Sequence, residues 1–81
     1  MKLYAITNNP TTRIGLEFAE ITTYLAHTQN ELRQALEVIP HVERLIIITE
    51  KLATANTDAL QEYREKNPKT LVTIIPEPHS S

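Results

Sequence analysis

The 81 residues of this chain suffice for one small domain, and a net charge of −2 gives no electrostatic reason to bind nucleic acid or an anionic membrane. The absence of cysteine excludes disulfides, thiolate catalysis and zinc–thiolate sites. The sequence has no apolar run near the roughly 20 residues of a membrane span and no signal-peptide pattern, so we expect a cytoplasmic protein that does not insert into a membrane.

A strand is predicted over residues 2–7, and a helix should follow it. The candidates for burial in this strand are Leu3, Ala5 and Ile6. Asn9 is a good helix N-cap, and Pro10 suits the first helical position, where its missing N–H costs nothing. Apolar side chains then recur at helical spacing, which predicts one buried face: Ile14, Phe18 and Ile21.

Gly15, the only glycine of the chain, lies inside this predicted helix. A glycine there costs about 1 kcal/mol relative to alanine. The plainer explanation is a tolerated cost or close packing within the domain. The alternative is the close approach of a partner's backbone.

A polar strand and a well-capped helix come next. Residues 21–26 predict a short strand whose polar character suits the edge of a sheet. Thr28 and Glu31 have the spacing of a capping box, in which each side chain accepts a hydrogen bond from the other residue's backbone N–H. The helix that follows ends before Pro40, and its apolar face consists of Leu32, Ala35, Leu36 and Ile39.

The run Leu45 to Ile48 predicts the central strand of a sheet. A strand with one solvent-exposed face would alternate apolar and polar residues, whereas this run is apolar throughout. We therefore expect helices over both faces of this strand and full burial of Ile47. Glu50 and Lys51 then open a short helical segment. Thr57 is expected to cap a second helical segment at 58–66, which precedes a strand over 71–75 that is very apolar for an edge.

These elements predict an α/β fold of the flavodoxin-like or Rossmann-like kind. Helical connectors imply parallel strands and right-handed crossovers. We therefore expect a small, doubly wound, four-stranded parallel sheet of order 2-1-3-4 with three helical connectors. Residues 1–78 should form a single domain, followed by a flexible tail at 79–81.

The sequence offers little for catalysis, and we predict no catalytic residue, no metal site and no cofactor. It has no Gly-rich phosphate loop, its three histidines lie at unrelated positions, and its serines are confined to the tail. The turn at Asn8 and Asn9 opens a helix N-terminus and could receive an anion, although a capped helix explains it more simply.

The stretch Leu45-Ile46-Ile47-Ile48-Thr49-Glu50-Lys51-Leu52-Ala53 resembles the strand-to-helix signature of the F subunit of the V-type (archaeal and bacterial A/V-type) ATPases. Thr12 to Ala19 is similar to the family's first helix, and Leu71 to Pro76 is similar to its last strand. This chain departs from the family in having Glu17 and Glu20 in place of an arginine and a closing glycine, and Asn8-Asn9 in place of Gly-Asp. It also ends at Ser81 without the family's C-terminal helix, as a short variant or a truncated form would.

The resemblance implies a non-catalytic rotor subunit that is peripheral on the cytoplasmic side of a membrane complex. It would dock on the coiled-coil D subunit of the central stalk and modulate ATP hydrolysis by the catalytic head. We expect the partner to contact the carboxyl ends of the third and fourth strands, at Glu50, Lys51, Ala53, Ile75 and Pro76. The alternative function is a small regulatory domain that binds an anionic ligand at Asn8 and Asn9.

Overall fold

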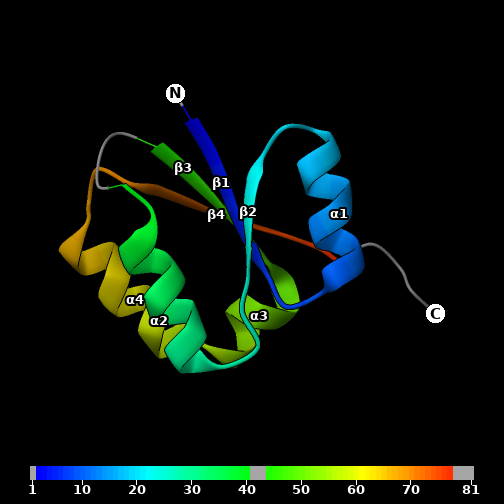
Figure 1. The fold of residues 1–81 in the computed structure, drawn as a ribbon. Helices are drawn as coiled ribbons and strands as arrows, with labels where there is room; N and C mark the ends of the chain where they lie inside the picture. The colour runs from blue at the N-terminus through cyan, green and yellow to red at the C-terminus, as the bar shows by residue number, and fades with distance from the viewer. Residues whose placement is uncertain (1, 41–43, 78–81) are drawn as a thin grey trace.

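The structure, a computed structural model, describes residues 2–40 and 44–77. Within them the elements follow in the order β1 (Lys2–Thr7), α1 (Pro10–Phe18), β2 (Thr22–Leu25), α2 (Gln29–Val38), β3 (Arg44–Thr49), α3 (Glu50–Ala55), α4 (Thr57–Lys66) and β4 (Leu71–Ile75) (Figure 1). The sheet is parallel throughout and has the order β2-β1-β3-β4, which confirms the predicted α/β class and strand order. The predicted tail at 79–81 lies outside the described residues.

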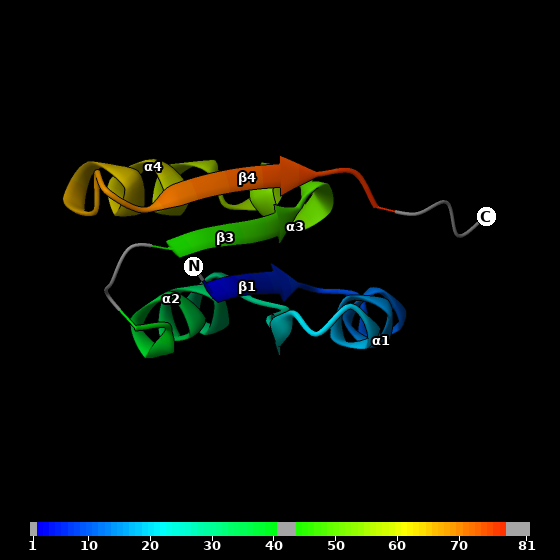
Figure 2. The ribbon, with the colours of Figure 1, turned by 90° about the horizontal axis from the view of Figure 1, so that it is seen from above.

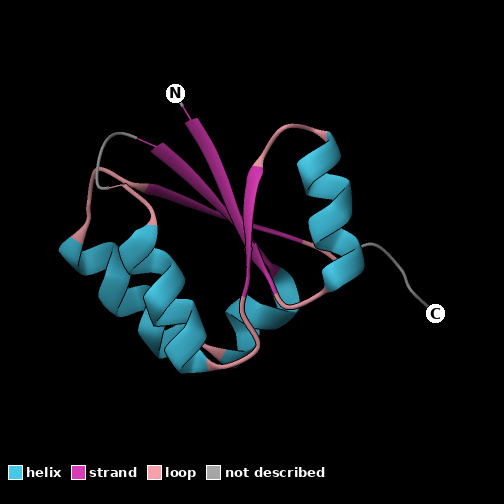
Figure 3. Ribbon diagram, in the orientation of Figure 1, coloured by secondary structure: helices cyan, strands magenta, loops and turns pink. Residues whose placement is uncertain are grey.

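The strand register divides the sheet into two faces. Tyr4 lies beside Ile46, and Ile46 lies beside Val72. Because paired residues of a parallel sheet point to the same side, the even-numbered residues of the four strands share one face and the odd-numbered residues share the other. Figures 1 and 3 show α2 and α4 on one side of the sheet and α1 on the other.

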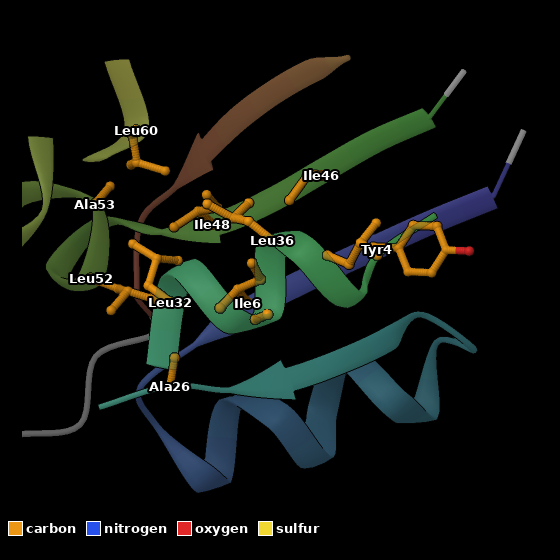
Figure 4. Packing of buried hydrophobic residues seen from close by; sticks show 12 residues of the cluster. Tyr4, Ile6, Ala26, Leu32, Leu36, Ile46, Ile48, Leu52, Ala53 and Leu60 are labelled. Atoms are coloured by element: carbon orange, nitrogen blue, oxygen red, sulfur yellow. The ribbon is translucent and has the colours of Figure 1, made fainter. Parts of the chain in front are cut away.

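The even-numbered face carries the hydrophobic core, and we call it the covered face. Its strand residues Ile6, Ile46 and Ile48 are completely buried. They pack in one cluster with side chains from α2, α3 and α4, among them Leu32, Leu36, Leu52 and Leu60 (Figure 4). The predicted apolar face of α2 is confirmed as buried, and the capping box of Thr28 and Glu31 is present.

The odd-numbered face is only partly covered, and we call it the open face. Helix α1 stands beside β2 and β1, whereas no helix stands on that side of β4 among the described residues (Figure 2). Leu45 and Ile47 of β3 are therefore half-buried, and Leu71 of β4 is 60% exposed. The expectation of helices on both sides of the sheet is confirmed, but the expectation that both faces of β3 are covered and Ile47 is buried was wrong.

The direction in which the chain moves through the sheet explains this one-sided cover. From β1 to β2 it moves toward one edge, and from β2 to β3 to β4 it moves toward the other. Right-handed crossovers in opposite directions place their helices on opposite faces, so α2 and the third connector share one face and α1 alone lies on the other. The same asymmetry leaves Leu3 39% exposed while Tyr4, on the covered face, is buried, so the prediction that Leu3 is buried was wrong.

The apolar stripe predicted for the first helix is not buried. Ile14 is 53% exposed and Phe18 is 84% exposed, while the buried residue of the helix is Thr12. Ile21 lies beyond the helix, because α1 ends at Phe18 in a Schellman turn. In this turn the N–H of Ile21 donates to the carbonyl of Leu16, and Glu20 adopts the left-handed conformation with φ of 63°.

This turn leads to a stability prediction. Glu20→Gly should raise the free energy of unfolding by about 1 kcal/mol, because a left-handed conformation costs a residue with a Cβ about 1–2 kcal/mol and costs glycine almost nothing. Chemical denaturation of both proteins gives the difference. Glu20→Ala is the matched control, since it removes the charge and keeps the Cβ. An equal gain in the two variants would assign the effect to charge and contradict the conformational explanation.

The third connector is two helices divided at Asn56. The Asn56 side chain is buried, and its Nδ2 donates a hydrogen bond to the carbonyl of Leu52. This bond occupies a carbonyl of the last turn of α3, which ends at Ala55. Thr57 does not cap the next helix as predicted, because α4 begins at Thr57 itself and the Thr57 hydroxyl donates to the carbonyl of Thr54. The break lets α3 and α4 turn separately onto the covered face.

Candidate functional site

The carboxyl ends of β1 and β3 are joined by a buried pair of hydroxyl groups. Thr7 Oγ1 accepts a hydrogen bond from the Thr49 hydroxyl at 3.0 Å and another from the Asn9 N–H at 3.1 Å. Both threonines are completely buried. Thr49 precedes Glu50 directly, so this pair fixes the corner at which the third strand becomes a helix.

In the turn after β1, backbone N–H groups at the start of α1 already donate hydrogen bonds within the chain. Asn8 and Asn9 are half-buried, and Asn9 Oδ1 accepts from the N–H groups of Thr11 and Thr12, as predicted for an N-cap. The Thr12 hydroxyl donates to Oε2 of Glu77 at 3.1 Å. A carboxylate of the chain itself thus lies at this helix N-terminus, where a bound anion would have to lie, and this weighs against an anion site at Asn8 and Asn9.

The predicted contact residues lie in three different settings. Glu50 and Lys51 are exposed at the start of α3, whereas Ala53 is 4% exposed and belongs to the core. Ile75 is half-buried and Pro76 is exposed at the end of β4. Ile75 pairs with Thr49, so Pro76 and Glu50 both follow directly on paired residues at the same end of the sheet. The structure brings four of the five residues to one end of the sheet and buries Ala53 in the core.

A groove separates α1 from the end of β4. It is lined by Thr11, Thr12, Gly15, Leu16, Ile75 and Pro76. Its volume is about 240 Å³, below the range of about 300–1,000 Å³ that is usual for small-molecule pockets. Its lining is apolar on both walls, which suits side chains of another protein better than a polar metabolite.

The sequence reasoning missed α1 as a surface element, although it did single out Gly15. A Cβ added at Gly15 would meet no atom within 4 Å, so close packing inside the domain does not explain this glycine. The remaining explanations are a tolerated cost and the approach of a partner. On the same helix, Ile14 precedes Gly15 by one residue and Phe18 follows it by three, and both are exposed. Their helical spacing was a true signal of an apolar face, but spacing alone does not tell a core from a partner contact.

The described residues contain no group of three or more histidine, aspartate and glutamate side chains that could hold a metal ion. None of the helices among residues 2–40 and 44–77 combines the length and the apolar character that crossing a membrane requires.

Comparison with known proteins identifies one family. The family model described as ATP synthase (F/14-kDa) subunit matches residues 3–81, nearly the whole chain. Neither the search of curated proteins nor the search of solved structures found a match.

Proposed function

Because this chain belongs to the ATP synthase (F/14-kDa) subunit family, we propose that it is a rotor component in the central stalk of a V-type ATPase or ATP synthase. In this role it docks on the coiled-coil D subunit on the cytoplasmic side of the membrane, and it catalyses no reaction itself. The observation that carries the proposal is the family match over residues 3–81. The two expected motifs at Leu45–Ala53 and Leu71–Pro76 both lie within the matched range.

The surface of the domain supports a docking role. Isolated soluble domains seldom expose large apolar side chains close together. Here Ile14 and Phe18 are exposed one turn apart on α1, and Leu71 is exposed on the open face of β4. A rigid sheet with apolar groups at its margin suits a stalk component that transmits torque and regulates the catalytic head through contacts.

We place the charged rim of the contact at the carboxyl ends of β3 and β4. Glu50 and Lys51 supply the charges, and Ile75 and Pro76 supply apolar surface beside them. Ala53 acts indirectly in this proposal, since its burial against the core holds α3 in place. Rim charges of this kind act mainly on encounter and register.

Lys51→Glu should weaken binding to the coiled-coil partner, and the loss should be larger at low salt than at high salt. The reason is that an exposed charge at a contact rim is screened within about 8–10 Å at physiological ionic strength. Isothermal titration calorimetry of the two proteins at two salt concentrations measures the effect. Lys69→Glu, which changes an exposed lysine before the start of β4, is the control with the same change of charge.

Two results would count against the proposal. If the wild-type chain fails to bind the coiled-coil partner, the proposed stalk function is wrong. If the wild type binds and Lys51→Glu binds equally well at both salt concentrations, the function stands and the charged rim lies elsewhere on the domain.

A further inference from the structure

The open face has room for one more helix. Parallel sheets of this kind are normally covered by helices on both faces. Here the position beside α1, over the odd-numbered residues of β3 and β4, is empty among the described residues (Figure 2). Its floor includes Leu45 and Ile47, which are half-buried, and Leu71, which is 60% exposed. Resting on the function proposed above, we propose that one α-helix of the coiled-coil partner lies in this position, alongside α1, and we call the position the helix seat.

Gly15 has no side chain, so the surface of α1 that borders the helix seat allows a close approach at this residue. It lines the groove between α1 and β4, and a Cβ at this position would meet nothing of this chain within 4 Å. Packed helices have axes about 8–10 Å apart, depending on the side chains between them, so a glycine allows the shorter distance. Phe18 lies three residues further along the helix, is 84% exposed, and can pack over the incoming helix.

The size of the seat suits a helix. β3 has six residues and spans about 20 Å at about 3.3 Å per residue. About 13 residues of helix cover the same length at 1.5 Å per residue. A single helix of a coiled coil therefore contacts the seat along its whole length, which an isolated side chain or a small ligand does not.

The charge of the seat indicates the chemistry of the occupant. Glu77 follows β4 and lies against α1, where its Oε2 accepts a hydrogen bond from the Thr12 hydroxyl. Its other oxygen, Oε1, has no hydrogen-bond partner among the described residues, and neither has Nε of Arg13 on α1. The carboxylate brings a negative charge to this end of the groove, which favours a partner with a positive one. We infer that the partner helix presents a lysine or arginine here, next to the small or apolar residues that pack on Gly15 and Ile47.

Gly15→Leu separates binding from folding. A Cβ at this position meets nothing within 4 Å, the groove leaves space for the rest of the side chain, and leucine improves the helix propensity of α1, so the melting temperature should stay the same or rise. Because the leucine fills the seat, affinity for the coiled-coil stalk protein of the same ATPase should fall by about tenfold or more, which corresponds to about 1.4 kcal/mol. Gln34→Leu, which adds the same side chain to the exposed surface of α2, should leave the affinity unchanged.

Two further variants test the floor and the charge. Thr73→Lys places a charge on the open face of β4 and should also reduce the affinity by about tenfold or more. Glu77→Gln should reduce affinity less, and the reduction should diminish at high salt. Titration calorimetry gives the affinities, and thermal melts confirm that each variant is folded.

Each outcome decides one question. Failure of the wild type to bind overturns the stalk function. Normal binding by the wild type together with unchanged affinity of Gly15→Leu and Thr73→Lys overturns the helix seat alone. If sedimentation shows that the wild type self-associates and that Gly15→Leu abolishes only this self-association, the occupant is a second copy of the chain, and the proposed partner helix is wrong.

Discussion

Ile48→Ala should lower the free energy of unfolding by about 2–5 kcal/mol, the usual cost of emptying a buried isoleucine site. Ile48 is completely buried on the covered face, in the cluster that joins β3 to α2 and α3. The total stability of an 81-residue domain is of order 4–12 kcal/mol, so the variant loses a large part of it. Urea denaturation measures the loss. If Ile48→Ala does not fold, Ile48→Val provides the milder test, with an expected cost of about 0.5–1.5 kcal/mol.

Ile47→Ala is the matched comparison. Ile47 is the next residue along the same strand, but it points to the open face and is only half-buried. Its truncation removes less buried surface and leaves no enclosed cavity, so the cost should be below about 2 kcal/mol. Equal losses at the two positions would show that both faces of β3 are covered and would contradict the description of the open face.

Thr7→Val should lower the free energy of unfolding by about 2–4 kcal/mol. The hydroxyl oxygen of Thr7 accepts hydrogen bonds from Thr49 and from the Asn9 N–H, and valine keeps the shape of the side chain while removing this acceptor. Each donor left without an acceptor in a buried place costs about 1–3 kcal/mol. The position also fixes β2, since the Thr7 carbonyl accepts from the Ala26 N–H.

Thr7→Ser is the control for this experiment. Serine keeps the hydroxyl and loses one methyl group, which costs about 1 kcal/mol. The loss in the serine variant measures the methyl group, and the loss in the valine variant measures the acceptor, each relative to the wild type in urea denaturation. A valine variant as stable as the wild type would mean that the two hydrogen bonds contribute nothing net at the corner between β1 and β3.

Local patterns in the sequence predicted the elements well. Asn9, Thr28 and Glu31 act as caps because capping depends on neighbours two to four residues away, and this information is contained in the sequence. The strand order also followed, because helical connectors and right-handed crossovers leave few arrangements for four parallel strands.

Burial was harder to predict because it depends on which helix covers which face. The stripe of Ile14 and Phe18 has the spacing of a core face, yet these residues are exposed, because α1 turns its opposite side, with Thr12, toward the rest of the domain. Likewise, Tyr4 is buried and Leu3 is not. The periodicity identified apolar faces correctly and could not say which of them is buried within this chain and which is exposed.

The position and exposure of the predicted contact residues followed from the sequence in part. Glu50, Lys51 and Pro76 are exposed at one end of the sheet, as a contact surface requires, because parallel strands bring their carboxyl ends together. Ala53 lies close to Lys51 in sequence, but two residues of helix place it about 200° further around the axis, on the buried side of α3. The groove beside Gly15 joins residues from opposite ends of the chain, and no local pattern could have indicated it.

The outer edge of β4 has a further consequence for a copy of this chain that has no partner. The strand reads Leu-Val-Thr-Ile-Ile, without a charge, and its free edge can pair with the same strand of another copy, which is how aggregation begins. Lys69 before it and Pro76 and Glu77 after it are gatekeepers, and Arg64 covers one carbonyl of the strand by donating to Val72 at 3.3 Å. The charged residues and the proline lie on either side of Leu71–Ile75, and none lies within the strand. The soluble fraction of a chain without its partner should therefore fall steeply as its concentration rises, and binding to a partner should prevent this aggregation.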